Sequence, residues 1–340
     1  MLQFDLQNDK IDKIVPRLQV KSEVSIVSDL TKIKPSELPS DKEEIQFEED
    51  SNTFKITISQ SAATKNMQHN FAAFEAWSLV VKSAGYARVI LAEKEHKYKM
   101  DKNEKRHYNR FLYRVLCFNK GFEWFDISAE LQDKIKAFEK TELTKELFIN
   151  APLSEPKEPD EKSHEAVMEM RLTKDKNNSR LNLMLGTDIG KFYQQLPVGL
   201  FEGGVKTDNA IFPSDKAAID IWGLSGSVFH LIELKVKSNT DLGVLSEVFF
   251  YACFINDMLC GRRLETKESA ELLRYKKDGE FYRGYTQLTQ AKIDSVVAYI
   301  LTEKKHGKLD DAFAELQNCD IKGIEFAKAI RYPLFEEVNE

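Results

Sequence analysis

The stretch that decides the fold runs from Ala218 to Lys237 and reads AIDIWGLSGSVFHLIELKVK. Two runs rich in β-branched and aromatic residues, Ala217–Trp222 and Val228–Val236, indicate strands. Between them, Gly223–Ser227 (GLSGS) has the length and composition of a hairpin turn. The sequence therefore predicts an antiparallel β-hairpin in this stretch.

Three charged residues, Asp220, Glu233 and Lys235, stand inside these apolar strands. Alternation along a strand puts Glu233 and Lys235 on one face, and it puts Asp220 opposite the isoleucines beside it. Burying such charges without partners costs several kcal/mol. Mg²⁺ or Mn²⁺, held by Asp220 and Glu233, would compensate the acids, because hard cations prefer oxygen ligands. Lys235 would then orient or activate a water and stabilise charge on a phosphate.

Two other interpretations of the same residues stay open. Glu233 and Lys235 could form a buried salt bridge that serves only the fold. The strands could instead lie at the edge of a sheet, where their charges would meet solvent.

The motif resembles the signature of the PD-(D/E)XK, or restriction-endonuclease-like, superfamily. Asp220 is followed, after twelve intervening residues, by Glu233 and by Lys235 two positions later, which matches an acid on one strand and Glu-x-Lys on the next. Ile219 stands where the family name has proline.

The resemblance covers Glu165 to about Tyr332 and includes the order of the elements. It implies an α/β fold in which a mixed sheet is flanked by helices. It also implies a divalent-metal-dependent nuclease that hydrolyses phosphodiester bonds, in DNA rather than RNA, as an endonuclease rather than an exonuclease. Asp220, Glu233 and Lys235 would be its catalytic residues.

The family commonly has a further metal-binding glutamate on the helix before the first core strand. Glu165 and Glu169 in HEAVMEMRL lie one helical turn apart on the same face, and we favour Glu169 slightly. Glu247 in LSEVFFYACF is the position that matches a polar residue facing the site after Glu-x-Lys. Each of these glutamates could instead be a solvated helix charge.

A basic and aromatic segment, Arg262–Tyr285, is the best candidate for contact with nucleic acid, because it mixes phosphate-pairing and base-stacking side chains. Its candidate phosphate contacts are Arg262, Arg263, Arg274, Lys276, Lys277 and Arg283. A solvated helical hairpin, in which Glu265, Glu268 and Glu271 offset the charge, is the alternative.

The domain organisation follows from a chain of 340 residues, which is long enough for about two domains. Asn150–Ser163 (NAPLSEPKEPDEKS) has three prolines and little to bury, so it reads as a linker. We expect a smaller α+β domain at 1–150, a linker at 151–163 and the nuclease-like domain at 164–340. The first domain has no recognisable catalytic motif, which suggests recognition or partner binding.

The remaining elements are expected from hydrophobic periodicity. Lys34–Asn52, with its acidic run, reads as a solvated loop. The expected helices are Phe71–Ala84, Tyr108–Phe118, His164–Leu172, Leu181–Leu196, Val244–Leu259 and Leu309–Gln317. The expected strands outside the hairpin are Phe54–Ser59, Tyr86–Leu91, Phe122–Ile127, Val198–Phe201, Ser295–Leu301 and Ile324–Tyr332.

The composition narrows the class and the compartment. Hydrophobic residues make up 42% and charged residues 31%, as in a globular protein. No run of 18 apolar residues exists and the first residues are polar, so we expect a cytoplasmic protein without a membrane partner. A net charge of −6 argues against indiscriminate binding of polyanions. The four cysteines, expected to be reduced and mostly buried, are Cys117, Cys253, Cys260 and Cys319.

Other functions compete with the nuclease. A catalytically silent nucleic-acid-binding or scaffold protein could keep the same fold, although the intact Asp, Glu and Lys argue against it. The N-terminal half could also carry the activity, with the C-terminal half as an accessory. A homodimer is a further possibility.

Overall fold

The computed structural model describes residues 38–39, 43–67, 69–94, 99–149, 163–174, 177–213, 217–236, 241–260 and 284–332. Contacts group Ile33–Glu340 into one compact unit, to which all of these residues belong. The expected linker at 151–163 lies outside the described residues apart from Ser163, so a domain boundary there stays a prediction.

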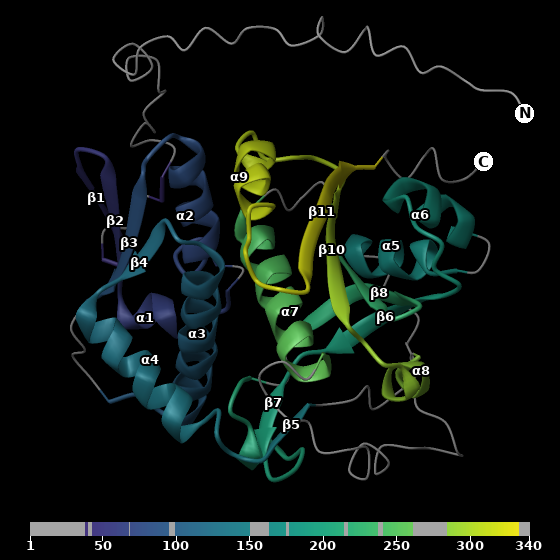
Figure 1. The fold of residues 1–340 in the computed structure, drawn as a ribbon, viewed down its shortest axis with the longest axis horizontal. Helices are drawn as coiled ribbons and strands as arrows, with labels where there is room; N and C mark the ends of the chain where they lie inside the picture. The colour runs from purple at the N-terminus through teal and green to yellow at the C-terminus, as the bar shows by residue number, and fades with distance from the viewer. Residues whose placement is uncertain are drawn as a thin grey trace, which may run out of the picture. The chain divides into compact units, whose positions relative to one another are not determined.

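The N-terminal half contains a sheet with strand order β1-β2-β3-β4 (Figure 1). The first pair is antiparallel and the next two pairs are parallel. Its strands are β1 (Ile45–Asp50), β2 (Thr53–Ile58), β3 (Arg88–Glu93) and β4 (Phe125–Ile127). Its helices are α1 (Gln60–Ala63), α2 (Phe74–Ser83), α3 (Lys102–Gly121) and α4 (Ala129–Thr141). The expected strands and helices of this half are confirmed, with α3 beginning six residues earlier than expected and the other ends shifted by up to three residues. The elements α1, α4 and β1 were not expected.

The acidic run before residue 51 is a strand and not the solvated loop that we expected. Strand β1 pairs along its full length with β2, and its charged residues lie on an edge open to solvent. Ile45 is buried and anchors the strand to the core. Charge alone therefore misled the interpretation, because an edge strand needs only one apolar face.

The C-terminal half is built on a mixed sheet with strand order β11-β10-β9-β8-β6. Strand β10 is parallel to β9 and β11, whereas β8 is antiparallel to β9 and β6. These strands are β6 (Phe192–Pro197), β8 (Ala218–Ser225), β9 (Val228–Lys235), β10 (Ser295–Thr302) and β11 (Ile324–Arg331). A separate pair joins β5 (Leu147–Ile149) to β7 (Leu200–Glu202). The helices are α5 (His164–Leu172), α6 (Asn178–Leu185), α7 (Gly243–Leu259), α8 (Tyr285–Gln290) and α9 (Leu309–Leu316), with a short 3-10 turn at Thr207–Asn209.

The hairpin that decides the fold is confirmed. Ser225 pairs with Val228, so the connection is the two-residue turn Gly226-Ser227. Gly226 has a φ of 58°, a left-handed conformation that glycine adopts without steric cost.

One expected helix is wrong in its second half. Leu181–Leu196 was expected to be helical throughout, but α6 ends at Leu185 and β6 begins at Phe192. Gly186, with a φ of 74°, caps the helix in the left-handed conformation. The strand expected at Val198–Phe201 is β7, which begins two residues later and ends one residue later.

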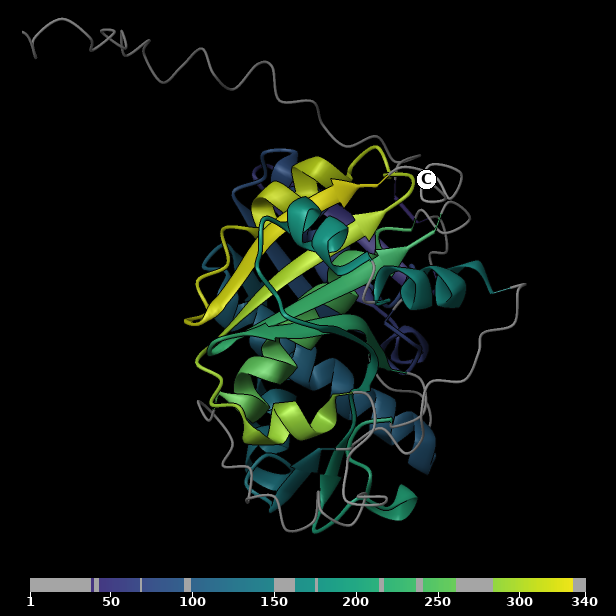
Figure 2. The same ribbon diagram turned by 90° about the vertical axis from the view of Figure 1, so that its right-hand side faces the viewer.

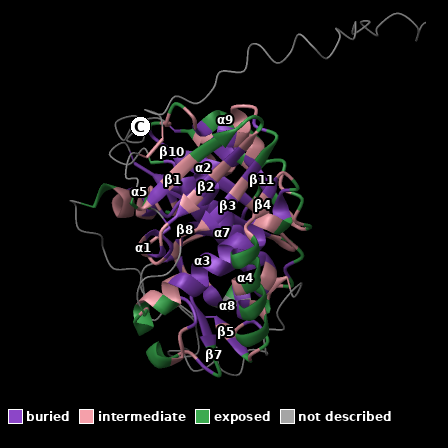
Figure 3. Ribbon diagram, turned by 90° about the vertical axis from the view of Figure 1, so that its left-hand side faces the viewer, coloured by how far each residue is buried: buried purple, intermediate pink, exposed green. Residues whose placement is uncertain are grey.

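Helices cover both faces of the mixed sheet. Buried residues of α5 and α6 pack with Ile221, Ile232 and Leu234 on one face, and Figure 2 shows these teal helices in front of the sheet. Helix α7 packs against β9 and β10 from the other side and is itself covered by α2 and α3. This explains why its sequence is apolar nearly all round. Figure 3 shows α7 as largely buried, whereas α4 has an exposed face.

Candidate active site

Strands β8 and β9 bring the three residues of the expected motif together. Ile221 pairs with Ile232, which places Asp220 beside Glu233 on neighbouring strands. The Asp220 carboxylate oxygen Oδ2 accepts a hydrogen bond from the backbone N–H of Leu234 at 2.9 Å. The acid is thereby held at the middle of the sheet rather than at an exposed edge.

The ammonium of Lys235 links several carboxylates. Its Nζ lies 2.9 Å from Glu233 Oε1 and 3.0 Å from Oε2 of Glu247 on α7. Oε1 of Glu165 on α5 lies 3.5 Å away. The salt bridge of the alternative interpretation is therefore present, but Glu233 is not the only acid in it.

Glu169 completes the cluster from α5. Its oxygen Oε2 accepts a hydrogen bond of 2.6 Å from the side-chain amide of Gln195 on β6. Glu169 is buried, whereas the Glu165 side chain keeps 33% of its surface exposed. The cluster thus meets solvent at Glu165, and Glu169 lies on its inner side.

Burial and mutual repulsion disfavour ionisation of these acids. Asp220 is 8%, Glu233 1% and Glu169 4% exposed. Burial raises the pKa of Asp220 to about 6, although Lys235 and the Leu234 N–H oppose the shift. Burial and the neighbouring Asp220 raise the pKa of Glu169 to about 8 and that of Glu233 well above its ordinary value.

The surroundings of Lys235, by contrast, favour its charged form. Burial alone would lower its pKa, but Glu233, Glu247 and nearby acids outweigh burial and raise that pKa well above its ordinary value. The lysine therefore carries its proton at neutral pH and acts as a fixed positive charge.

The donor set fits a hard divalent cation in its chemistry. Glu233 Oε2 is buried and accepts no hydrogen bond within the part of the chain that the structure describes. Carboxylate oxygens of this kind are what Mg²⁺ and Mn²⁺ take as ligands. In the present side-chain arrangement, however, no group of three or more His, Cys, Asp or Glu among the described residues is placed to hold an ion. The Lys235 ammonium, which contacts both Glu233 and Glu247, takes the central position instead.

Tyr251 is a residue that the sequence interpretation missed. It lies one helical turn after Glu247 on α7 and is buried. Burial and then Glu247, Glu233 and Asp220 raise the pKa of its hydroxyl well above the ordinary value, so this hydroxyl stays protonated among the acids. The spacing of Glu247 and Tyr251 was the available signal, because side chains four apart share a helix face.

His230 on β9 is a core histidine. It is buried between the hydroxyls of Ser225, 2.7 Å from Nε2, and Tyr299, 3.2 Å from Nδ1. Burial lowers the pKa of His230 to about 4.

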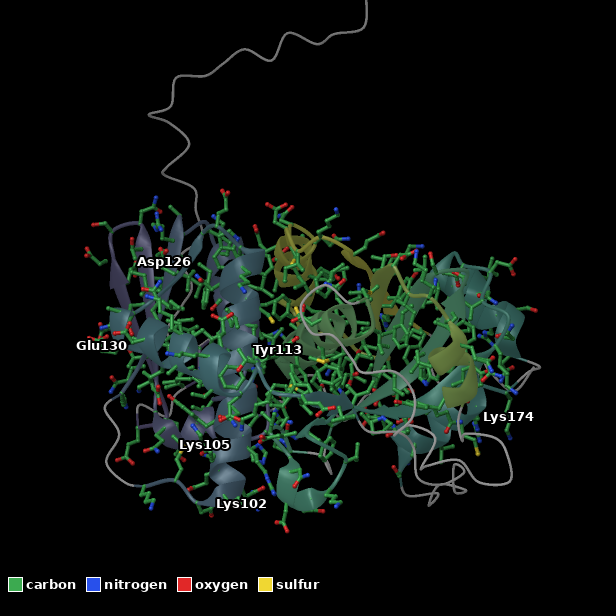
Figure 4. All side chains as sticks on the ribbon, turned by 60° about the horizontal axis from the view of Figure 1, so that its bottom comes forward. Lys102, Lys105, Tyr113, Asp126, Glu130 and Lys174 are labelled. Carbon is green, nitrogen blue, oxygen red and sulfur yellow. The ribbon has the colours of Figure 1, made fainter. Side chains whose placement is uncertain are left out.

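The expected nucleic-acid-binding residues, Arg262, Arg263, Arg274, Lys276, Lys277 and Arg283, lie outside the described residues. Two cavities elsewhere have no lining residue in common with the carboxylate cluster. One, of about 560 Å³, is lined by residues that include the buried cysteines Cys117 and Cys253, which form no disulfide. The other, of about 480 Å³, is lined by residues that include Lys102 and Lys105. Figure 4 shows these two lysines pointing outward at the beginning of α3, whereas Tyr113 of the same helix lies in the interior.

Comparisons with protein-family models, curated proteins and solved structures give no significant match to this chain. The superfamily resemblance therefore rests on the motif and on the mixed sheet that contains it. No described helix has the length and apolar character that crossing a membrane requires.

Proposed function

We propose that the chain is a divalent-metal-dependent nuclease of the PD-(D/E)XK type that acts as an endonuclease on DNA in the cytoplasm. The observation that carries this proposal is an excess of acidic over basic groups at one buried position. Among the described residues, five carboxylates lie around the single ammonium of Lys235, namely Asp220, Glu233, Glu165, Glu169 and Glu247. Most of them are buried, so their ionised forms are costly unless another cation shares them.

A buried ion pair in the N-terminal half shows the contrast with a purely structural bridge. The Arg114 guanidinium donates to both carboxylate oxygens of Glu75 and to the carbonyl of Ala72. One acid faces one base there, and the charges balance. The acids around Lys235 outnumber their base, which is typical of an active site that binds a cation.

The residues have distinct roles in this proposal. Asp220 and Glu233 would hold the ion, with Glu169 as a third carboxylate. A bound Mg²⁺ or Mn²⁺ would polarise the scissile phosphate and lower the pKa of an attacking water. Lys235 keeps its proton, so it would stabilise negative charge on the phosphate rather than act as a base. The Leu234 N–H fixes one oxygen of Asp220.

The second candidate is a catalytically silent nucleic-acid-binding or scaffold protein. The close contacts of Lys235 with Glu233 and Glu247 favour it, because the ammonium compensates part of their negative charge without a metal ion. Metal binding separates the two candidates directly.

The test is a cleavage assay on supercoiled, linear and single-stranded DNA and on RNA, with Mg²⁺, Mn²⁺ or EDTA. We expect metal-dependent nicking of DNA by the wild type and a loss of about 10²-fold or more in Asp220→Asn, the usual order for removal of a charge-stabilising group. Asp126→Asn is the control, since Asp126 is a partly exposed acid that pairs with Arg88. Absence of both cleavage and metal binding in the wild type would support the silent candidate.

A further inference from the structure

Gln195 has an unusual backbone for a residue in the middle of a strand. Its φ is 52°, in the left-handed region that non-glycine residues rarely adopt. Among the described non-glycine residues, Ser51 shares this feature, but it lies in the turn between β1 and β2, where such a conformation is common. A strained conformation inside a sheet persists only when its surroundings enforce it, and it often marks a functional site.

The strain coincides with a gap in the sheet beside the carboxylate cluster. Strand β6 pairs with β8 through Gln194 with Ile221 and through Leu196 with Ile219. Gln195 therefore stands opposite Asp220, and this pair is missing from the described ladder. The side chains of these two residues bind elsewhere. The Asp220 carboxylate accepts a hydrogen bond from the backbone of Leu234 on β9, and the Gln195 side-chain amide donates one to Glu169 on α5.

Two consecutive glutamines at this position reach the same helix. Gln194 Nε2 donates to Thr173 Oγ1 at 2.6 Å, and Gln195 Nε2 donates to Glu169 Oε2 at 2.6 Å. In a regular strand these neighbours would point to opposite faces of the sheet. Both side-chain amides nevertheless reach the same segment, Gln195 at Glu169 on α5 and Gln194 at Thr173, the C-cap of that helix.

We propose that Gln195 is a positioning residue that orients the Glu169 carboxylate beside Asp220, so that the two acids can share one divalent cation. The inference rests on the proposed function. An outer hydrogen bond of this kind fixes the direction of a metal-binding carboxylate, and its removal weakens metal affinity by about 10- to 100-fold. Gln194 ties the end of α5 to the same strand through Thr173, and its partner among the described residues is a hydroxyl, not a carboxylate.

The experiment measures Mn²⁺ affinity of the full chain by isothermal titration calorimetry. Gln195→Asn shortens the side chain by one methylene, so the amide falls short of Glu169, while Asn tolerates a positive φ. Gln195→Gly removes the amide and adopts the same backbone without strain, so it covers the case in which the asparagine variant folds poorly. We expect both variants to bind Mn²⁺ about 10- to 100-fold more weakly than the wild type. Gln194→Asn is the matched control and should keep wild-type affinity.

A double-mutant cycle separates positioning from a general structural effect. If Gln195 acts through Glu169, Gln195→Asn should cause no further loss of affinity in a Glu169→Ala background. Three outcomes would overturn the inference and leave the proposed function standing. Gln194→Asn could lose as much Mn²⁺ affinity as Gln195→Asn, or Gln195→Asn could lose just as much affinity in the Glu169→Ala background as in the wild type. The third outcome is unchanged Mn²⁺ affinity in both Gln195 variants. A wild type that binds no Mn²⁺ would overturn the proposed function, and the inference with it.

Discussion

Replacing Asp220 by Asn should make the metal-free protein more stable at alkaline pH. The substitution removes a buried negative charge, and the amide oxygen of the new side chain can still accept the hydrogen bond from Leu234. A residue kept for function often costs stability, whereas a residue kept for the fold does not. The sign of the change therefore distinguishes an active-site acid from a structural partner of Lys235.

The magnitude follows from the pKa of Asp220, which burial raises from 3.8 to about 6. A group whose pKa is raised in the folded state stabilises the fold below its unfolded pKa and loses that contribution as the pH rises through the folded value. Each pKa unit corresponds to about 1.4 kcal/mol. Relative to a side chain that cannot ionise, Asp220 should thus lower the free energy of unfolding by about 1.5 kcal/mol at pH 5 and about 3 kcal/mol at pH 8.

The assay is urea denaturation in EDTA at pH 5 and pH 8, with the wild type, Asp220→Asn and Glu75→Gln. The free energy of unfolding of Asp220→Asn should exceed that of the wild type by about 1.5 kcal/mol at pH 5 and about 3 kcal/mol at pH 8. Glu75→Gln should be less stable than the wild type by roughly 3 to 5 kcal/mol, because it leaves the buried Arg114 without its carboxylate. Saturating Mn²⁺ at pH 8 should stabilise the wild type and not Asp220→Asn. If Asp220→Asn is instead less stable than the wild type at pH 8 in EDTA, the carboxylate is a structural ion-pair partner and the reasoning fails.

Three further predictions concern other parts of the structure. Lys235→Met should lower the free energy of unfolding by roughly 3 to 5 kcal/mol at pH 8, because its carboxylate partners lose their ammonium. The loss should be smaller at pH 5, because Glu233, whose pKa burial raises well above its ordinary value, takes up a proton more readily there; an equal loss at both pH values in urea denaturation would contradict this. Gly223→Ala should lower the free energy of unfolding by about 1 to 3 kcal/mol in thermal or urea denaturation, because the added Cβ would lie 2.6 Å from Ile189. Gly190→Ala is the control, because its Cβ would meet nothing within 4 Å and should cause no such overpacking. His230 should stay neutral from pH 5.5 to pH 8 in an NMR titration, because burial lowers its pKa to about 4, and a midpoint near 6.5 would show that it is solvated.

Local pattern alone was enough to identify the hairpin and the central helix. The alternation around Asp220 and Glu233 produces two strands in the structure, and the glycine-containing turn joins them as expected. The apolar run of α7 is buried on all sides as its sequence indicated. These predictions succeeded because the interactions that favour each element are close in sequence and repeat with its period.

Local pattern failed where neighbouring elements decided the outcome. The acidic run of β1 became a strand because β2 offers it a partner along its whole length. The segment after Leu185 left the helix because Gly186 caps it and β8 pairs with Phe192–Pro197. Strand pairing is a contact between segments distant in sequence, so the β-propensity of one segment does not predict whether it finds a partner strand.

For the candidate site, the sequence by itself determined which acids and which lysine share the central strands, namely Asp220, Glu233 and Lys235. Only the tertiary structure decided that Lys235 bridges several carboxylates and that these groups are buried deeply enough to shift one another's pKa. Only the tertiary structure turned Gln195 toward Glu169. The physical reason is that electrostatic repulsion, desolvation and backbone strain depend on distances between α5, α7 and the sheet, and those distances exist only once the chain has packed.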